Sequence, residues 1–404
     1  MKFNFRSIHF KLTIWYVLYL LAVLLVLSLL VYFSRAHSFK CLAIFLLGSG
    51  IVALTVAGFW GRFLVRKYLK PIDDITKTAQ KIEAENLTER FEMPKTGDEL
   101  SQLASTLNEM IDRLELSLQQ IRQFTADASH ELRTPLTVIR GQTEVILRRE
   151  RSTEEYRQVL ESNLEEMEWM SRMIDNLLTL SRADAGQLQI ELEPVQLKRL
   201  VVEAYEECYM LAEAKKLSVF LDKIEAALVY GDEMWLRQVL MNLIDNAVKY
   251  TPEGGKIWLS LEVEAGYAKL TVKDTGIGIP EADLPKIFDR FYRVDKARSR
   301  QMGGSGLGLN IVNWIISAHK GCVEVTSRLE EGSCFTIWFD EVPEEVVEVV
   351  ERVLSGGKIR AMEKCEENGK LMYKVRKSVA AGEYEIKVAA DGVLEEVKRA
   401  SGSQ

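Results

Sequence analysis

Two long apolar runs lie near the N-terminal end of the chain. The first, Leu12 to Phe33, carries no charge, and a helix of that length spans roughly 33 Å, enough to cross the hydrocarbon layer of a membrane. The second, Cys41 to Gly61, contains glycines and small residues, which membrane helices tolerate because they allow close packing. A cleaved signal peptide is the alternative for the first run, but no small-residue cleavage site follows it. The pattern predicts a transmembrane hairpin in residues 1–61, in contact with membrane lipid.

Basic residues flank these runs unequally. Only Arg35 and Lys40 lie in the link between the runs. The outer basic residues are Lys2, Arg6, Lys11, Arg62, Arg66, Lys67 and Lys70. Because cytoplasmic flanks are enriched in Lys and Arg, we expect a multi-pass protein of the bacterial cytoplasmic (inner) membrane with both termini cytoplasmic. The link is too short to fold as a ligand-binding domain, so the stimulus must be sensed within the bilayer, through a partner, or from inside.

Residues 62–115 hold two stretches with apolar positions at three- and four-residue spacing, LKPIDDITKTAQKI and LSQLASTLNEMIDRL. A turn-forming MPKTGDE segment precedes the second stretch. Pro71 lies at the start of the first predicted helix and Glu99 opens the second. The arrangement resembles a HAMP linker, and a plain coiled-coil linker is the alternative.

Residues 116–186 continue with a heptad-like seam that runs from Ile111 to Ile139. A second helical pattern, Tyr156 to Leu180, supplies the partner helix, and two such hairpins from two chains predict a homodimeric four-helix bundle. In this register His130 points away from the bundle axis. A lone exposed histidine is ordinarily a surface residue, so its neighbours decide how it is interpreted.

Those neighbours supply groups that phosphoryl transfer needs. Pro135 removes a donor for the carbonyl of Glu131, which costs about 3 kcal/mol in a helix interior and places a bend beside the histidine. The sequence ASHELRTPL, Ala128 to Leu136, resembles the H-box of bacterial sensor histidine kinases. The resemblance implies that His130 is the phosphoacceptor, Glu131 its general base and Thr134 the residue linked to phosphatase activity.

Residues 187–342 alternate helical and strand-like runs, which predicts an α/β sandwich. On a helix from Asp232 to Tyr250, the polar residues Asn242, Asn246 and Lys249 share one face. Asparagine oxygens suit a Mg²⁺ ion that keeps waters and phosphate oxygens, and Lys249 suits a phosphate. A solvated polar face is the other interpretation of this helix taken alone.

Two glycine motifs follow. In DTGIGIP, Asp274 can accept a hydrogen bond from an adenine amino group while the glycines let backbone approach a flat ligand. In GGSGLGLN, Gly303 to Asn310, glycines precede an apolar helix and can expose N–H groups to phosphates. Between the motifs, residues 285–302 are rich in Arg and Lys and suit a lid.

With NLIDNAVKYTP and FDRFYRVD, these motifs resemble the N, G1, F and G2 boxes of the histidine-kinase ATP domain in their expected order. The resemblance implies binding of ATP and Mg²⁺, with Asn242 on the metal. It also argues against direct ATP hydrolysis, because hydrolysing relatives carry a glutamate where this chain has Asn242. The nucleotide ligands that it implies are Asn242, Asn246, Lys249, Tyr250, Asp274, Gly276, Gly278, Arg290, Arg293, Gly304, Gly306, Leu307 and Gly308.

Overall charge and cysteine content narrow the function classes. The 404 residues carry 52 Lys and Arg against 59 Asp and Glu, so a net charge of −7 gives no basic field for nucleic acid. The five cysteines are scattered and only four histidines are present, which disfavours a metal cage. We expect reduced cysteines in a cytosolic setting.

Residues 343–404 follow the kinase-like part. A helical run, PEEVVEVVERVL, precedes the strand-like runs GKIRAMEKC, KLMYKVRKS and EYEIKVAA, the last of which leads through Asp391 and Gly392 to VLEEVKR. The pattern predicts a small α+β module that faintly resembles PepSY modules. We expect a regulatory or protein-binding role for it.

Together the patterns predict a multidomain membrane protein, and the resemblance implies a sensor histidine kinase that phosphorylates His130 from ATP and passes the phosphoryl group to an aspartate of a cytoplasmic response regulator. A kinase-dead adaptor, which uses the ATP domain as a nucleotide-gated binding module, is one alternative. An enzyme that acts chiefly as a phosphatase through Thr134 is the other. The sequence names neither the stimulus nor the cognate regulator, and it leaves open whether phosphorylation occurs within one chain or between two.

Overall fold

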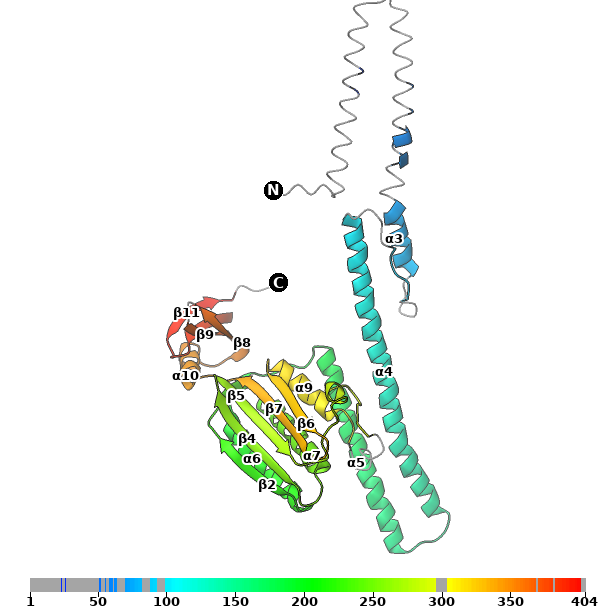
Figure 1. Cartoon of the computed structure of the whole chain (residues 1–404), viewed down its shortest axis with the longest axis vertical. Helices are drawn as coiled ribbons and strands as arrows, with labels where there is room; N and C mark the ends of the chain where they lie inside the picture. The colour runs from blue at the N-terminus through cyan, green and yellow to red at the C-terminus, as the bar shows by residue number, and fades with distance from the viewer. Residues whose placement is uncertain are drawn as a thin grey trace, which may run out of the picture. The chain divides into compact units, whose positions relative to one another are not determined.

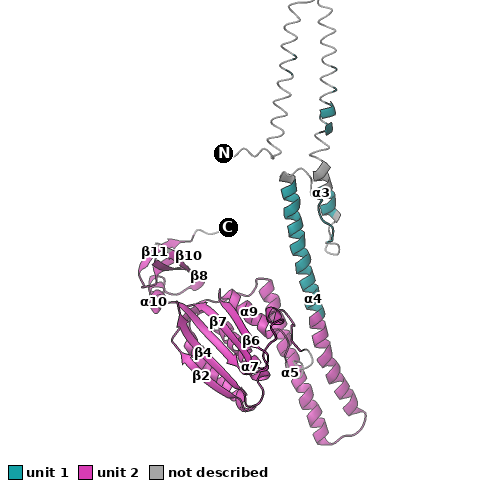
Figure 2. Ribbon diagram, viewed as in Figure 1, with its two compact units in different colours: residues 1–126 teal, residues 127–404 magenta. Residues whose placement is uncertain are grey.

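The computed structural model describes isolated positions between 23 and 63, then residues 70–81, 88–92, 99–295, 304–367, 370–380 and 382–400. Two compact units emerge, residues 1–126 and 127–404 (Figure 2). Among the described residues, no helix is both long enough and apolar enough to cross a bilayer. The predicted spans 12–33 and 41–61 lie almost wholly outside those residues.

The first unit contains α3 (Lys70–Lys81) and the beginning of α4 (Glu99–Leu147). A small core of Phe91, Ala104 and Ile111 holds the connector against α4. The Asn108 side chain accepts a hydrogen bond from the Phe91 N–H (2.8 Å) and donates one to the Phe91 carbonyl (3.0 Å), so it satisfies both backbone groups of Phe91. Pro71 lies within the first turn of α3, where its missing N–H costs little.

One continuous helix, α4, carries both the second helical stretch of the HAMP-like region and the first helix of the predicted hairpin. The heptad-like apolar pattern continues across residues 111–121 with no glycine or proline to end the helix, so the predicted boundary at 115/116 falls inside it. Pro135 also lies inside α4, and the helix continues through it to Leu147.

A second helix, α5 (Thr153–Asp184), pairs with α4 to form the hairpin (Figure 1). It starts with a capping box, in which the Ser152 hydroxyl accepts from the Glu155 N–H and the Glu155 carboxylate accepts from the Ser152 N–H. Asn163, almost fully buried, donates to the Thr143 hydroxyl at 3.2 Å and fixes the register of the two helices. Many apolar side chains of the hairpin stay exposed in the single chain: Leu136, Val145, Leu160, Leu164, Met167, Ile174 and Leu178.

A five-stranded sheet with order β2-β4-β5-β7-β6 forms the centre of the ATP-domain region. Only the β2–β4 pair is parallel. The strands are β2 (Ser218–Ile224), β4 (Lys256–Glu264), β5 (Tyr267–Asp274), β6 (Cys322–Arg328) and β7 (Gly332–Asp340). Alternate residues face the core: Ile257, Leu259 and Leu261 on β4 are fully buried.

Three helices supply the other half of that core. They are α6 (Leu197–Glu213), α7 (Glu233–Tyr250) and α9 (Gly308–Ala318), with a short 3₁₀ turn, η2 (Leu284–Lys286), between β5 and α9. Leu240, Leu243 and Ile244 of α7 are buried against the sheet, as the helical periodicity predicts. The α/β ATP-domain fold and the helical hairpin are therefore confirmed.

The C-terminal residues form a separate layer. They comprise α10 (Glu344–Val353) and an antiparallel sheet of β8 (Lys358–Glu367), β9 (Lys370–Val379), β10 (Gly382–Ala389) and β11 (Leu394–Arg399), in the order β11-β10-β9-β8. We call this helix and sheet the C-terminal module. A two-stranded sheet, β1 (Glu193–Gln196) with β3 (Leu228–Gly231), lies near it, and Tyr230 shares the module's apolar core.

Candidate nucleotide and phosphotransfer site

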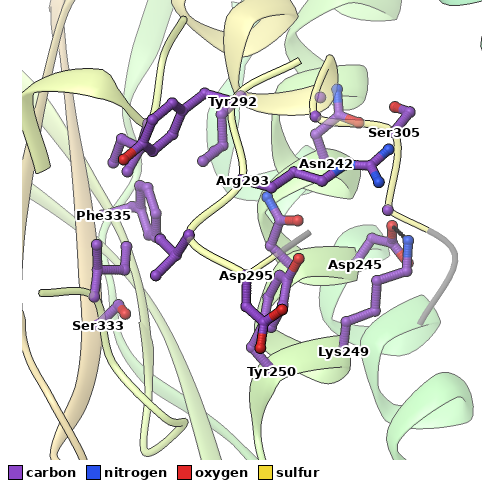
Figure 3. Close-up of a pocket in the computed structure, with 18 of the residues that line it drawn as sticks. Asn242, Asp245, Lys249, Tyr250, Tyr292, Arg293, Asp295, Ser305, Ser333 and Phe335 are labelled. Carbon is purple, nitrogen blue, oxygen red and sulfur yellow. Dashed lines mark hydrogen bonds and ion pairs between the residues drawn. The ribbon is translucent and has the colours of Figure 1, made fainter. Parts of the chain in front are cut away.

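A cavity of about 430 Å³ lies between α5, α7, the loops that follow β5, and the start of α9. This volume falls within the range of roughly 300–1,000 Å³ that is ordinary for ligand pockets. Figure 3 shows polar side chains of α7 on one side, with Ser333 and Phe335 of β7 opposite. Apolar residues, among them Ile279, Ile287 and Met173, complete the lining. The cavity thus combines an apolar interior with convergent polar groups.

The polar face of α7 lies at the cavity. Asp232 caps the helix, since its carboxylate accepts from the N–H groups of Met234 and Trp235. One side of the helix packs on the sheet, so Asn242, Asn246 and Lys249 are turned into the cavity. Lys249 pairs with Asp245 at 2.5 Å (Figure 3). The buried Nδ2 of Asn242 has no partner in the described part of the chain, as expected of a group that meets a ligand.

Asp274, at the end of β5, is 7% exposed. Its Oδ1 accepts from the Gly276 N–H at 2.7 Å and from the Ser333 N–H at 3.2 Å. Burial raises the pKa of this carboxyl, and the two N–H donors partly oppose that rise. No hydrogen bond within the described residues engages the other oxygen, Oδ2. The carboxylate is therefore held by one oxygen while the second can accept from a ligand.

Two glycines allow close approach of backbone around the cavity. Gly278 has φ +69°, and a Cβ there would lie 1.9 Å from the Arg328 carbonyl oxygen. Gly306 has φ +71°, and a Cβ would lie 2.8 Å from the carbonyl carbon of Phe291. The Phe291 N–H also donates to the Gly306 carbonyl at 2.9 Å. Only glycine fits both positions without backbone movement.

The basic segment after η2 joins the cavity to the hairpin. Arg293 lines the cavity, and its guanidinium donates to Glu131 of α4 at 3.0 Å; the two side chains are 5% and 19% exposed. Arg290 pairs with Asp184 at the end of α5 at 2.6 Å. Residues 296–303 of the predicted lid lie outside the described residues.

His130 is exposed on α4, as its heptad position predicts. Across the described residues, no hydrogen bond to its imidazole ring is found. Thr134, one turn on, donates its hydroxyl hydrogen to the His130 carbonyl at 3.2 Å. Glu131, through Arg293, is an H-box side chain that contacts the ATP domain.

Ten of the thirteen predicted nucleotide ligands line the cavity: Asn242, Asn246, Lys249, Tyr250, Asp274, Gly278, Arg293, Gly304, Gly306 and Gly308. Three do not. Leu307 caps α9 and is fully buried in the core, Gly276 serves the Asp274 carboxylate through its N–H, and Arg290 is engaged by Asp184. These three residues therefore do not line the cavity themselves.

One wall of the cavity is formed by residues that the sequence pattern did not predict as ligands. Trp169, Arg172, Met173, Asp175 and Asn176 reach it from α5. Their helical spacing matches a bundle helix, and nothing in the sequence separates bundle-facing from cavity-facing positions. Further lining residues that were not anticipated are Asp245, Tyr292, Asp295, Ser305, Ser333 and Phe335.

Three family models match the chain. One, described as the "Histidine kinase-, DNA gyrase B-, and HSP90-like ATPase", covers residues 231–343; the "His Kinase A (phospho-acceptor) domain" covers 120–186; and the "HAMP domain" covers 63–116. His130 lies in the second range, and most of the cavity lining lies in the first. The chain belongs to the family of bacterial two-component sensor histidine kinases.

Curated sensor histidine kinases are similar in sequence to this chain. The sensor histidine kinase CusS of Escherichia coli (strain K12) is 39% identical over 265 residues, 65% of this chain and 55% of CusS. The probable sensor kinase SilS of Salmonella typhimurium is 37% identical over 273 residues, 66% of this chain and 54% of SilS. The histidine-protein kinase ArlS of Staphylococcus aureus (strain USA300) is 31% identical over 301 residues, 74% of this chain and 66% of ArlS. The chain spans a little over half the length of the first two relatives.

Proposed function

We propose that this chain is an ATP-dependent protein histidine kinase that phosphorylates His130 and passes the phosphoryl group to an aspartate of a response regulator. One observation carries the proposal: the cavity that holds the nucleotide-binding motifs takes one wall from α5, and its Arg293 pairs with Glu131, the neighbour of His130. The part of α4 that carries His130 and the nucleotide cavity therefore belong to one unit, residues 127–404.

The cavity offers one set of groups to the adenine ring of ATP and another to its phosphates. The free oxygen of Asp274 accepts from the adenine amino group, while Lys249 and Arg293 offer positive charge to phosphates. Among the described residues, no cluster of three or more His, Cys, Asp or Glu side chains could hold a metal. An Mg²⁺ ion would instead take the Asn242 amide oxygen with phosphate oxygens and waters, and would supply neutralisation of the phosphate charge. The partnerless amide nitrogen of Asn242 agrees with a side chain that is oriented by a ligand.

The reaction needs a nucleophile, a proton acceptor and a leaving group. A lone pair on an imidazole nitrogen of His130 forms the N–P bond as the P–O bond to ADP breaks, and ADP leaves with that electron pair. Glu131 accepts the proton released from the imidazole. Positioning supplies most of the rate, because phosphoryl transfer requires little covalent work from the protein.

A homodimer is part of the same proposal. Large apolar side chains of α4 and α5 remain exposed in a single chain, among them Leu160 at 66% and Leu164 at 57%, and exposed apolar surface of this kind marks interaction sites. A second hairpin would bury them in a four-helix bundle. The predicted transmembrane hairpin, with both termini in the cytoplasm, would place the kinase at the bacterial inner membrane.

Label from γ-labelled ATP tests the activity. The full chain should acquire acid-labile, base-stable label, and His130→Gln should not. Arg376→Ala, on the exposed face of β9, serves as the matched control and should label like wild type. If the wild-type chain binds nucleotide but takes up no label, the adaptor interpretation replaces this one.

The phosphatase alternative rests on Thr134. Equal rates of dephosphorylation of a phosphorylated partner by wild type and Thr134→Ala would exclude a role for this hydroxyl. Slower dephosphorylation by the variant would assign a phosphatase role to the Thr134 hydroxyl.

A further inference from the structure

The segment that joins α5 to the ATP-domain sheet, residues 185–192, is held by the C-terminal module. Leu192 forms an antiparallel bridge with Ile359 of β8 and packs on the module's apolar core. Glu191 pairs with Lys358. Any movement of the ATP domain relative to the hairpin must pass through this segment, which we call the linker. The module therefore contacts the covalent connection between the hairpin and the ATP domain.

The module is also fixed to the ATP domain itself. Lys364 donates to the Gly266 carbonyl at 2.8 Å and lies 4.4 Å from the centre of the Tyr267 ring. Lys320, just after α9, donates to the Met362 carbonyl at 3.2 Å. Linker, ATP domain and module thus meet at one place.

At that meeting place lies a second cavity, of about 270 Å³. Its apolar lining residues come from all three parts: Ile190, Leu192, Val229, Ala318, Phe339, Val342, Ala361 and Met362. The polar or charged lining residues are Tyr230, His319, Lys320, Asp340, Arg360, Lys364 and Tyr373. The volume is just below the roughly 300 Å³ at which drug-sized pockets begin, so it suits a small metabolite.

Charge at the cavity favours an anion. Three cations line it, of which Lys320 pairs with Glu363 at 3.3 Å and Lys364 lies 3.7 Å from the lining carboxylate Asp340, so Arg360 carries the charge that is left for a ligand. Both nitrogens of His319 are engaged: Nδ1 donates to the Ile315 carbonyl, and Nε2 accepts from the Asp232 N–H. Burial lowers the pKa of His319, so its ring stays neutral and does not bind the anion.

Two polar side chains that line this cavity are available to a ligand. Arg360 is exposed and forms no ion pair within the described residues. It is the extra residue of a β-bulge, because Ile359 pairs with Lys377 while Ala361 pairs with the adjacent Arg376. Bulges re-aim side chains and recur beside functional sites. The Tyr230 hydroxyl, in a side chain that is 8% exposed, is buried without a hydrogen-bond partner in the same part of the molecule.

We propose that this cavity binds a small organic anion with an apolar body, of the aromatic carboxylate class, and that the bound anion ties the linker to the C-terminal module. The carboxylate meets the Arg360 guanidinium, and the apolar body lies against Leu192 and Phe339. Occupancy then limits hinge movement of the ATP domain. The regulatory half of this proposal rests on the proposed kinase function, whereas the binding half does not.

Phenylacetate is the probe, and saturation-transfer NMR on the purified full chain in lipid nanodiscs is the assay. Wild type should bind phenylacetate, and Arg360→Ala should bind it roughly ten-fold more weakly, since a charge-assisted hydrogen bond is lost. Ala361→Phe, which fills the cavity, should abolish binding. Arg376→Ala, one residue pair away on β9, should bind like wild type. Unchanged ATP binding and melting temperature establish that each variant is folded.

Three results would overturn the binding half: no transfer to phenylacetate in wild type, equal binding of the neutral phenylacetamide, or binding retained in Ala361→Phe. For regulation, saturating phenylacetate should change the rate of His130 labelling at least two-fold in wild type and leave Ala361→Phe unaffected. An unchanged wild-type rate despite binding would overturn the regulatory half. Absence of label without the probe would instead refute the kinase function, and the binding result would stand.

Discussion

Replacing Asp274 by Asn should reverse the base preference of the nucleotide cavity. In the structure, Oδ1 is occupied by the N–H groups of Gly276 and Ser333, which leaves Oδ2 to the ligand. An asparagine can keep its oxygen on those two donors, and its NH₂ group then occupies the Oδ2 position. Adenine presents an amino group there, so two donors would face each other.

The magnitude follows from the contacts. Loss of a hydrogen bond to a charged acceptor removes about 1.5–3 kcal/mol, and a buried donor left unsatisfied costs about 1–3 kcal/mol more. Together these predict ATP binding weaker by roughly 10²- to 10⁴-fold. Inosine triphosphate carries a carbonyl oxygen in place of the amino group. It should therefore bind Asp274→Asn more tightly than ATP does, whereas wild type should prefer ATP.

Stability of the nucleotide-free chain provides the control. Burial raises the pKa of Asp274 above its unfolded value, so the contribution of this carboxyl to stability is full below its ordinary pKa and is lost as pH rises through the raised one. At neutral pH the ionised side chain is a cost, and Asp274→Asn should melt no lower than wild type. ATP affinity of wild type should also fall on acidification at a higher pH than an ordinary aspartate would give. Calorimetric titration with both nucleotides at several pH values tests these points, and an ATP affinity within three-fold of wild type would refute the assigned contact.

Three further outcomes are expected. Gly278→Ala should lower the free energy of unfolding by more than about 2 kcal/mol, because strain at a positive φ and a backbone clash combine. The control Gly186→Ala, with φ +63° and no atom within 4 Å, should lower it by only about 1 kcal/mol. Equal losses of the two variants in urea unfolding would contradict the clash at Gly278. A double-mutant cycle of Arg293→Met and Glu131→Gln, measured by the free energy of unfolding, should give a coupling energy of about 1–3 kcal/mol. A coupling energy under about 0.5 kcal/mol would mean that the ion pair contributes little to stability. Leu164→Asp, at a side chain 57% exposed in the single chain, should convert a dimer to a monomer in light scattering, and an unchanged mass would argue against the bundle.

Local patterns predicted the elements whose periodicity is strong. The runs KIWLSLEVE and YAKLTVKD coincide with β4 and β5, because both strands alternate buried and exposed side chains. The C-terminal helix and strands also lie where their patterns place them. The exposed position of His130 followed from the heptad register alone.

Features that depend on packing between distant segments were not predictable. The α5 wall of the nucleotide cavity arises because Met173 and Leu180 are buried with the ATP-domain core, and their spacing fits a bundle seam equally well. Leu307 looked like part of a phosphate loop, but its side chain completes the core under α9. Docking of β8 on the linker depends on one bridge between residues 167 positions apart, Leu192 and Ile359, which no local pattern encodes.

Arg293 contacts both the nucleotide cavity and the H-box. Its guanidinium lines the nucleotide cavity and also binds Glu131, with its Nε buried and unpartnered in the described part of the chain. A γ-phosphate entering the cavity adds negative charge beside the same guanidinium, so phosphate and Glu131 compete for it. Nucleotide binding would therefore weaken the Arg293–Glu131 ion pair at the step in which, under the proposed mechanism, the Glu131 carboxylate accepts the His130 proton. Without nucleotide the same ion pair would keep that carboxylate engaged, which would couple occupancy of the cavity to the reactivity of the histidine.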